Sequence, residues 1–366
     1  KKAGIEKGII VVSFHAYQVR QRFCHQFEGL FLDYVEQGDP LGTGHALKMA
    51  RPKLERAPFL VLNGDDLLLP KAIVEATKAI PSLVVAPHPQ PTRFGIVQVQ
   101  NGFVKKLVEK PQTAPPEALV STGAYCLPYE CLSLLDSLQP APDGELRLTD
   151  IMGPIIEAGL KAVVTDDGWI PVTYPWDVLL ATARLLSLWG TTDGDDLMLP
   201  PIVLGTIDPT ARVEGPVRIE EGAVIGKEAF VLGPSVIGRD AFVGEGTVVE
   251  GSVLGARCRI GSRSVIRKSI LFDDVTVGSD CHISTSVIGR SSRLEDAVRV
   301  KDRSPTGLTV RSVVRGMVVD SGLEELGCLI AEEVVVGKGV VLYPGVKVWP
   351  GQKIRSWSEA IEDVQG

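Results

Sequence analysis

Residues 207–249 read IDPTARVEGPVRIEEGAVIGKEAFVLGPSVIGRDAFVGEGTVV, and an aliphatic residue stands at every sixth position of this stretch. All eight positions obey the rule, namely Ile207, Val213, Ile219, Ile225, Val231, Ile237, Val243 and Val249. A six-residue repeat predicts a parallel β-helix, in which three six-residue sides form one triangular coil and the aliphatic side chains fill its axis. Each inward Ile or Val then contributes about 1.5–3 kcal/mol by burial, so the coils are stable only as a stack.

The repeat continues beyond residue 249, with slips of phase and one interruption. Apolar residues recur at six-residue steps after each slip: Leu254, Ile260, Ile266 and Phe272, then Leu271, Val277 and Ile283, then Ile288, Leu294 and Val300, and finally Ile330, Val336, Leu342, Val348 and Ile354. Glycine commonly follows the apolar residue, as in Ile260-Gly261, where it suits a tight corner. Residues 302–327 break the period, which predicts an extruded loop or an irregular coil.

The first half of the chain alternates short apolar runs with helical patterns, which predicts a mixed α/β domain with a largely parallel sheet. Strands are expected over 8–13, 30–35, 59–63, 82–86, 95–100, 104–109 and 123–127, and helices over 18–27, 146–157 and 178–188. The run at 8–13 is apolar throughout, as in a buried parallel strand. Asn101-Gly102 predicts a hairpin, because type I′ turns need positive φ at both central positions. We therefore expect an α/β domain at 1–189, a linker at 190–200 and the β-helix at 201–366.

Composition narrows the class of partner. The chain has 366 residues, a formal charge of −7 and no dense Lys/Arg run, which argues against nucleic acid because phosphate-backbone binding needs a basic face. Six scattered cysteines lack both a disulfide framework and a zinc signature, so we expect reduced thiols. No apolar run is long enough to span a bilayer and no signal peptide is evident, which makes the cytoplasm the expected location and a membrane partner unexpected.

The stretch from Gln37 to Asp66 carries the first functional pattern. A glycine-rich turn, residues 37–46, opens a helix, and the next strand ends on the carboxylate pair Asp65-Asp66. This order suits a nucleotide held above a parallel sheet, because glycine lets backbone N–H groups approach a ligand and ligands collect at the carboxyl ends of strands. An acid at that place could hold Mg²⁺. Taken alone, the pattern fits an ordinary strand–helix connection with a solvated Asp pair equally well.

Three other segments have both a functional and a structural interpretation. Glu109-Lys110-Pro111 places an acid and a cation at a strand end, although a surface ion pair has the same pattern. Asp150 could simply cap a helix. Trp169 and Trp176 could contact a ligand, but tryptophans in such a pattern more often belong to the hydrophobic core.

The ordered motifs together resemble those of the sugar-1-phosphate nucleotidylyltransferases. They are Gln37-x-x-x-x-Gly42-Thr43-Gly44-His45-Ala46, Asn63-Gly64-Asp65, Phe94-Gly95, Glu109-Lys110-Pro111 and Thr122-Gly123-Ala124-Tyr125. The resemblance covers essentially the whole chain and is closest to the long forms that make UDP-N-acetylglucosamine, UDP-glucose or dTDP-glucose. It implies a Rossmann-like nucleotidyltransferase domain followed by a left-handed parallel β-helix.

The same resemblance implies roles on the nucleotide side of the site. Gln37 would hydrogen-bond the pyrimidine edge, while Gly42 and Thr43 would shape the base pocket. The Gly-Thr-Gly-His-Ala form resembles the uridylyltransferases more than the thymidylyltransferases. Asp65 would hold the Mg²⁺ that bridges the nucleotide and sugar phosphates, which makes it both a metal ligand and a catalytic residue.

On the sugar side, the resemblance implies that Gly95 and Glu109 contact sugar hydroxyls and that Lys110, as a catalytic residue, contacts the sugar phosphate. Thr122 and Gly123 would form the sugar wall. The implied reaction joins UTP or dTTP to glucose-1-phosphate or N-acetylglucosamine-1-phosphate, with release of pyrophosphate. Such a site aligns the reacting groups and offsets charge with a divalent ion, Lys and backbone N–H groups, and it needs no covalent nucleophile.

The sequence departs from the family pattern at two points. The opening Gly-x-Gly-Thr-Arg phosphate loop of the family has no counterpart, so either the given sequence is incomplete at its N-terminus or the phosphate cradle has been lost. Many relatives carry a second metal-binding Asp two residues after the tryptophan, where this chain has Pro171, and Asp177 lies further along. A non-catalytic sugar-nucleotide-binding or assembly subunit is therefore the alternative to an enzyme.

The β-helix raises two further expectations. In some relatives it is an acetyltransferase that uses a histidine of the coil, and His282 is the histidine in the coil here. Its surroundings lack the associated pattern, so a surface histidine at a corner is the expected interpretation. The coil is expected to support a homo-oligomer, a trimer or a multiple of one.

Overall fold

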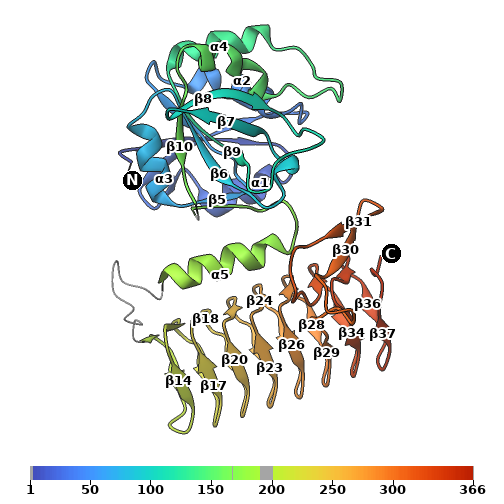
Figure 1. The fold of residues 1–366 in the computed structure, drawn as a ribbon. Coiled ribbons are helices and arrows are strands. Elements are labelled where there is room, and N and C mark those ends of the chain that lie inside the picture. The colour runs from blue at the N-terminus through green and yellow to red at the C-terminus, as the bar shows by residue number, and fades with distance from the viewer. Residues whose placement is uncertain (1–2, 167, 190–200, 366) are drawn as a thin grey trace. The chain divides into compact units, whose positions relative to one another are not determined.

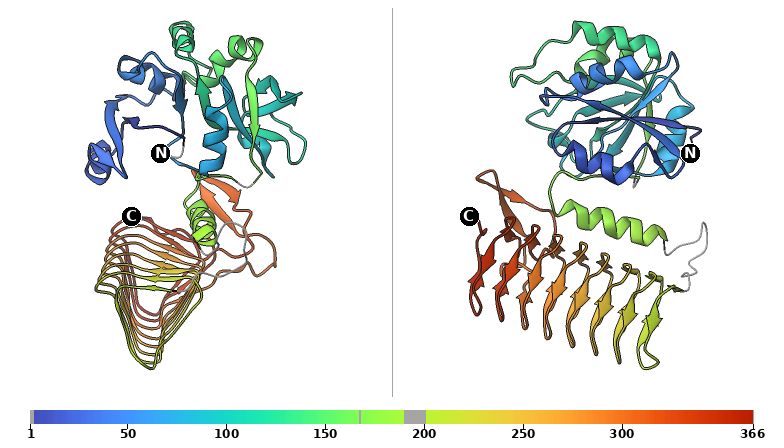
Figure 2. Two further views of the ribbon diagram at one scale, coloured as in Figure 1. Left: turned by 90° about the vertical axis from the view of Figure 1, so that its left-hand side faces the viewer. Right: turned by 180° about the vertical axis from the view of Figure 1, so that it is seen from behind.

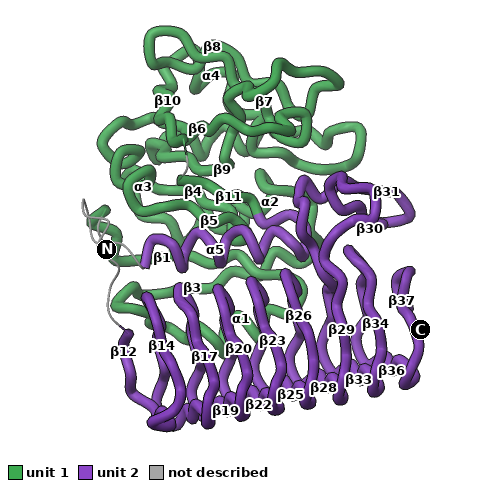
Figure 3. Tube along the Cα trace, turned by 60° about the horizontal axis from the view of Figure 1, so that its bottom comes forward, with its two compact units in different colours: residues 1–171 green, residues 172–366 purple. Residues whose placement is uncertain are grey.

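The computed structural model describes residues 3–166, 168–189 and 201–365. Contacts divide the chain into two compact units, Lys1–Pro171 and Val172–Gly366, which Figure 3 draws in different colours. The expected linker at 190–200 lies outside the described residues. The boundary expected from sequence, at residue 189, differs from the division by contacts because the last helix, α5 (Asp177–Trp189), packs within the second unit.

The first unit is built on a mixed six-stranded sheet of order β4-β9-β6-β10-β8-β7 (Figure 1). Its strands are β4 (Phe59–Val61), β6 (Ser82–Pro87), β7 (Ile96–Gln100), β8 (Phe103–Val108), β9 (Leu119–Leu127) and β10 (Lys161–Val164). Strand β6 is parallel to β10, while β9 is antiparallel to both β4 and β6. The predicted hairpin at Asn101-Gly102 is confirmed: both residues have positive φ and join β7 to β8.

Helices cover both faces of this sheet. Because alternate residues of a strand face opposite sides, Leu83 and Val85 pack with Leu47 of α2 (Thr43–Ala50), whereas Val84 packs with Ala76 of α3 (Pro70–Thr77). The first face is completed by α4 (Met152–Glu157) and by 3₁₀ helices at Tyr129–Ser137 and Leu148–Ile151. Further 3₁₀ turns lie at Arg51–Lys53 and Pro91–Arg93.

A separate three-stranded sheet of order β1-β3-β2 contains the first apolar run. Its elements are β1 (Lys7–Val12), β2 (Gln26–Phe27) and β3 (Leu30–Glu36), together with α1 (Ala16–Phe23). Strand β1 is parallel to β3, as expected, but only its last residue, Val12, is buried. The prediction of a fully buried strand was wrong because the strand joins this small sheet, in which Val12 packs with Leu32 and Tyr34 in a small core next to α1 while the other residues of β1 stay partly exposed. The helix predicted over 18–27 ends at Phe23, and Gln26–Phe27 turns back as β2.

The second unit is a parallel β-helix made of three eight-stranded sheets, and its triangular cross-section is visible in Figure 2. The first sheet contains β12 (Ile202–Val203), β15 (Val217–Ile219), β18 (Ser235–Ile237), β21 (Val253–Leu254), β24 (Ile270–Leu271), β27 (Val287–Ile288), β32 (Leu329–Ile330) and β35 (Lys347–Val348). The second contains β13 (Thr206–Ile207), β16 (Val224–Ile225), β19 (Phe242–Val243), β22 (Arg259–Ile260), β25 (Thr276–Val277), β28 (Arg293–Leu294), β33 (Val335–Val336) and β36 (Lys353–Ile354). The third contains β14 (Arg212–Glu214), β17 (Phe230–Leu232), β20 (Val248–Glu250), β23 (Val265–Arg267), β26 (His282–Ser284), β29 (Arg299–Val300), β34 (Val341–Leu342) and β37 (Glu359–Ala360).

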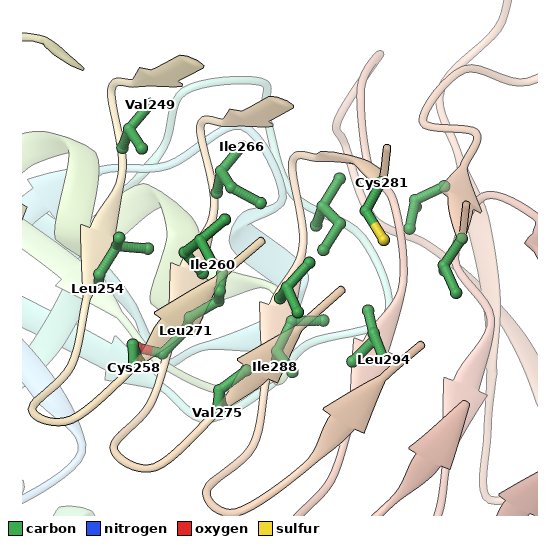
Figure 4. Packing of buried hydrophobic residues seen from close by; sticks show 14 of the residues in the cluster. Val249, Leu254, Cys258, Ile260, Ile266, Leu271, Val275, Cys281, Ile288 and Leu294 are labelled. Carbon is green, nitrogen blue, oxygen red and sulfur yellow. The ribbon is translucent and has the colours of Figure 1, made fainter. Parts of the chain in front are cut away.

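The repeat predicted from sequence forms the axis of this β-helix. Figure 4 shows Val249, Leu254, Ile260 and their neighbours packed inside the coil, and all three are essentially inaccessible to solvent. The first slip of phase has a simple cause: Val243 pairs with Ile225, 18 residues earlier, but with Ile260, only 17 residues later. One corner is therefore a residue shorter in the coils that follow up to Leu294, and the last coil, from Val336 to Ile354, has 18 residues again.

The structure also decides between the two phases near residue 271. Leu271 is fully buried, whereas Phe272 is 46% exposed, so only the first belongs to the core. The predicted interruption at 302–327 is confirmed, since it contains the hairpin β30 (Arg311–Val314) and β31 (Met317–Asp320) before the coil resumes at β32. Among the described residues, no helix is both long and apolar enough to cross a membrane.

Candidate functional site

Gln37 directly follows β3 and is fixed against the turn that opens α2. Its Nε2 donates a hydrogen bond to the carbonyl oxygen of Gly42 at 3.0 Å and lies 3.3 Å from Nδ1 of His45. The amide nitrogen of Gln37 is therefore engaged in holding the turn. The hydrogen bonds of the described residues leave its Oε1 without a donor, so this oxygen is the atom that can accept from a ligand.

The Gly42-Thr43-Gly44 turn holds the chain segment 146–148. Gly42 has φ +105°, and a Cβ built on it would lie 2.7 Å from the carbonyl oxygen of Leu146. The N–H of Gly44 donates to that same oxygen at 2.8 Å, and the N–H of Leu148 donates to Oγ1 of Thr43 at 3.0 Å. Two positions expected to shape a base pocket thus also fix a distant loop.

This contact explains why the helix predicted over 146–157 begins later. Leu146 is bound by the turn, its N–H donating to the carbonyl oxygen of Leu41 at 2.7 Å. A 3₁₀ turn then starts at Leu148, and the α-helix itself covers only Met152–Glu157. The prediction was wrong at its N-terminal end because a tertiary hydrogen bond overrides the local helical pattern. The arrangement also brings Arg147 into the electrostatic neighbourhood of Glu109, which sequence reasoning did not identify.

The two acids that follow β4, Asp65 and Asp66, differ in their surroundings. Asp65 is exposed, and none of the hydrogen bonds or ion pairs of the described residues involves its carboxylate. Asp66 begins β5 (Asp66–Leu68), and its Oδ2 accepts hydrogen bonds from Nδ2 of Asn63 and Nε1 of Trp169, both at 3.1 Å. Asp65 is thus the carboxylate available to a ligand or metal ion.

Strand β5 pairs with β11 (Trp169–Pro171), and the register places Pro171 opposite Asp66. Asp177 accepts hydrogen bonds at its Oδ2 from the backbone N–H groups of Thr173 and Tyr174, at 2.9 and 2.8 Å. Its carboxylate is therefore occupied in shaping the start of α5. Within the ranges that the structure describes, no group of three or more His, Cys, Asp or Glu side chains is arranged to hold a metal ion.

Gly95 and Glu109 lie side by side, as expected for two residues of one pocket. A Cβ built on buried Gly95 would be 3.0 Å from Oε2 of Glu109, so the absence of a side chain makes room for the carboxylate. The carbonyl oxygen of Gly95 accepts from the N–H of Ser121 at 2.7 Å, which ties this pair to β9. Lys110 is exposed and has φ +38°, and its N–H donates to the carbonyl oxygen of Phe94 at 3.2 Å.

Burial raises the pKa of the Glu109 carboxyl above its ordinary value, and the nearby cations Lys110 and Arg147 oppose that shift. A half-buried acid beside two cations can accept hydrogen bonds from neutral hydroxyl groups while its charge is balanced locally. This chemistry suits a polar, uncharged part of a ligand.

Thr122 and Gly123 both lie on β9 but differ in what they offer a ligand. The hydroxyl of buried Thr122 donates to the carbonyl oxygen of Val84 at 2.9 Å and accepts from the N–H of Ala124 at 3.3 Å. Gly123 has φ +73°, and the amide group of Asn63 occupies the space that a Cβ would need. The Thr122 side chain is thus structural, and Gly123 brings β9 against the loop that carries Asp65.

Two aromatic contacts near these residues were not expected to belong to the site. Trp169 is buried and packs edge-on against Phe94, with ring centroids 5.2 Å apart, and His88 lies 4.7 Å from the same phenyl ring. The pairing of Trp169 with Asp66 could not be found from sequence, because the two residues are separated by more than 100 positions and share no motif.

His282 lies on the outer surface of the β-helix. Its neighbours Cys281 and Ile283 are buried in the coil, and the imidazole of His282 is exposed next to the ladder positions of Val265 and Arg299. The expectation of a surface histidine is confirmed, but its placement at a corner was wrong, because His282 is the first residue of strand β26.

Two family models match different parts of the chain. Residues 1–184 match the model described as Nucleotidyl transferase, and residues 214–318 match the model described as EIF2B subunit epsilon LbH domain. The second is a left-handed β-helix domain, so the predicted α/β domain followed by a β-helix is confirmed. The prediction of a largely parallel sheet was wrong, because β9 runs antiparallel to β4 and β6, and β8 runs antiparallel to β7 and β10.

Curated relatives match over most of the chain. Bifunctional protein GlmU of Methanococcus vannielii is 28% identical over 317 residues, which cover 80% of this chain and 72% of that protein. The protein of the same name from Shouchella clausii is 28% identical over 322 residues, covering 83% and 69%. That of Burkholderia vietnamiensis is 30% identical over 305 residues, covering 74% and 66%.

Proposed function

Because the chain belongs to the nucleotidyl transferase family, we propose that it transfers a nucleotidyl group from UTP or dTTP to a sugar 1-phosphate. The observation that carries this proposal is the meeting of two motif groups: Asn63, from the loop of Asp65, contacts Gly123, while Gly95 and Glu109 join the same strand through Ser121. The exposed carboxylate of Asp65 and the half-buried carboxylate of Glu109 are thereby both linked to one strand, β9. The similarity to bifunctional GlmU proteins over most of the chain supports the same proposal.

On the nucleotide side, Gln37 is the residue that reads the base. Its Nε2 donates to the carbonyl oxygen of Gly42, so Oε1 is the atom that can bind a ligand. The N3–H of a pyrimidine base is a suitable hydrogen-bond donor to that oxygen. Gly42 and Thr43 act on the pocket through their backbone, since the Thr43 hydroxyl accepts from Leu148. The proposed preference is for UTP.

Asp65 fits the Mg²⁺ that the family resemblance implies. Mg²⁺ is commonly held by one or two protein carboxylates together with substrate phosphates and water, and the exposed Asp65 offers one such carboxylate. When bound, the ion supplies charge neutralisation for the phosphates at the reacting centre.

On the sugar side, Glu109 accepts hydrogen bonds from sugar hydroxyls, and Gly95 leaves room for that carboxylate. Lys110 attracts the sugar phosphate as an exposed cation next to Glu109. Gly123 and the backbone of Thr122 form the wall. Glucose-1-phosphate and N-acetylglucosamine-1-phosphate are the proposed acceptors.

The reaction requires alignment and charge compensation. A phosphate oxygen of the sugar phosphate attacks the α-phosphorus of the nucleotide and forms a new P–O bond. The bond from the α-phosphorus to the oxygen bridging to the β-phosphate breaks, and pyrophosphate leaves with the electron pair. Lys110 holds the sugar phosphate in line with the α-phosphorus, and such alignment is worth several kilocalories per mole when the geometry is correct.

The proposal is tested by incubating the full chain with each pairing of UTP or dTTP with the two sugar phosphates and identifying the products. We expect an NDP-sugar and pyrophosphate in equal amounts, with UTP preferred. Strict preference for dTTP would contradict the role given to the 42–44 turn. Sugar-nucleotide binding without turnover would support the non-catalytic alternative.

We further propose that the β-helix carries assembly into a homo-oligomer. Val224 and Phe242 are neighbours in one ladder, their side chains point outward, and both are 38% exposed, which gives the early coils an apolar strip for contact with another copy.

A further inference from the structure

Asp66 lies beside the proposed metal ligand, Asp65, but its carboxylate is engaged by neighbouring side chains. Its Oδ2 accepts from the side chains of Asn63 and Trp169, each at 3.1 Å. Trp169 is buried, and a buried indole N–H needs an acceptor. A carboxylate that accepts from two neutral donors forms charge-assisted hydrogen bonds, which are stronger than ordinary ones.

The bond to Trp169 joins two short strands. In the β5–β11 pair, Trp169 is opposite Leu68, and Asp66 is opposite Pro171. Asp66 and Trp169 are therefore diagonal neighbours, close enough for long side chains to touch. Each strand has only three residues, and a short two-stranded ribbon is marginally stable by itself. The side-chain bond therefore fixes the start of β5, the residue after Asp65.

The bond to Asn63 fixes the other side of Asp65. Asn63 contacts Gly123 so closely that a Cβ at residue 123 would clash with its amide group. Asp66 thus holds Asn63 against β9, while Trp169 packs on Phe94, the residue before Gly95. Asp65 lies in a turn whose two flanks are both attached through Asp66.

From this arrangement we propose that Asp66 is a positioning residue that fixes the Asp65 carboxylate for a divalent cation, through its hydrogen bonds to Trp169 and Asn63. The inference rests on the proposed function, because Asp65 has this role only in a metal-assisted nucleotidyl transfer. The relevant property is the hydrogen-bond geometry of Asp66, whose Oδ2 accepts from both donors.

Three variants separate the hydrogen bonds from charge and from packing. Asp66→Asn keeps an oxygen that can accept from Trp169 and Asn63 but removes the charge. Asp66→Ala removes both hydrogen bonds. Trp169→Phe removes the indole N–H and retains an aromatic ring against Phe94. Asp136→Asn is the matched control, because Asp136 is an exposed acid of the same unit, paired with Arg51.

The first measurement is binding of Mn²⁺, a spectroscopic substitute for Mg²⁺, by electron paramagnetic resonance in the presence of an unreactive UTP analogue. The second is the Mg²⁺ concentration that gives half-maximal turnover, compared with KM for the sugar phosphate. We expect Asp66→Ala and Trp169→Phe to weaken Mn²⁺ binding by about 10- to 100-fold, the usual effect of losing a residue that orients a metal ligand. Asp66→Asn should stay within about threefold of the wild type, and KM for the sugar phosphate should change less than the Mg²⁺ requirement.

The outcomes are distinguishable. Mn²⁺ binding by Asp66→Ala that equals that of the wild type and of Asp136→Asn overturns the inference, as does a rise in KM for the sugar phosphate as large as the rise in the Mg²⁺ requirement. A wild-type chain that binds no Mn²⁺ overturns it as well. If the wild type binds Mn²⁺ and the variants weaken binding as expected, but no substrate pair is turned over, the inference holds for the metal site and the proposed function fails.

Discussion

At Glu109, burial and charge act in opposite directions. Burial raises the pKa of the carboxyl above its ordinary value of 4.5, while Lys110 and Arg147 act to lower it. A group with a raised folded-state pKa contributes stability that is fully present below the unfolded pKa and is lost as pH rises through the folded pKa. The ionised carboxylate therefore costs stability at neutral pH, which is consistent with a residue retained for binding.

We expect Glu109→Gln to show this in two ways. Because Gln does not ionise, the Tm of the variant relative to the wild type should be higher at about pH 7 than at about pH 4. Sugar-phosphate recognition should meanwhile weaken by about 10- to 100-fold in kcat/KM, the effect of losing a hydrogen bond to a charged acceptor. Thermal unfolding across pH and steady-state kinetics measure the two effects. A Tm difference that does not change with pH would contradict the pKa argument.

Gly42 illustrates a second constraint at a single residue. Its φ of +105° and the 2.7 Å approach of the Leu146 carbonyl oxygen to a Cβ mean that Gly42→Ala must strain the turn. We expect a loss of about 1–3 kcal/mol in the unfolding free energy of the first unit, measured by denaturant titration. Gly153→Ala is the control, because a Cβ there has open space and the residue lies in a helix. Equal stability of the two variants would contradict the proposed tight contact between Gly42 and Leu146.

In the β-helix, the inward-facing aliphatic side chains stabilise the strands by packing along the axis. Ile260 is buried in the axis, whereas its neighbour Arg259 is exposed on the surface of the same strand. We expect Ile260→Ala to destabilise the second unit by about 2–5 kcal/mol through the cavity that it leaves, and Arg259→Ala to have a small effect. Urea unfolding of the two variants tests this, and similar losses for both would contradict the assignment of inward and outward positions.

Elements were predictable from sequence where a single periodic pattern decides them. The hexapeptide ladder was predicted because every coil repeats the same constraint, and the Asn101-Gly102 hairpin because its turn chemistry is specific. The helix over 146–157 was misplaced because Leu146 is bound by the Gly42 turn, a contact that no local pattern reveals. Phe272 could be excluded from the core only by structure, since a coil shortened by one residue changes which of two adjacent apolar residues faces inward.

The candidate site was predictable to a different extent. Asp65, Gly95, Glu109 and Lys110 follow from motifs, and the contact of Gly95 with Glu109 agrees with a shared role. Their roles toward a ligand stay predictions. The roles of Asp66, Arg147 and Trp169 were missed because each depends on residues far away in the sequence. Supporting residues of this kind have no motif, since many different sequences can position the same ligand-binding atom.

At the scale of the whole molecule, the proposed homo-oligomer depends on the outer surface of the β-helix. We expect Phe242→Glu to lower the oligomer mass measured by light scattering, because it places a charge in the proposed apolar strip with Val224. Lys353→Glu, on the last strand of the same sheet, is the control. An unchanged mass for Phe242→Glu would contradict assembly through this strip, and a monomeric wild type would contradict the oligomer itself.

We propose that the chain is a metal-dependent nucleotidyltransferase acting on a sugar phosphate. The most direct measurement is pyrophosphate release by the full chain from UTP and N-acetylglucosamine-1-phosphate or glucose-1-phosphate, with and without Mg²⁺, for the wild type and Asp65→Asn. We predict Mg²⁺-dependent release with the wild type and a loss of about 10²-fold or more with Asp65→Asn, as expected when a key electrostatic contact at the reacting centre is removed. Absence of turnover with every nucleotide and sugar-phosphate pair, or equal turnover by Asp65→Asn, would contradict the claim.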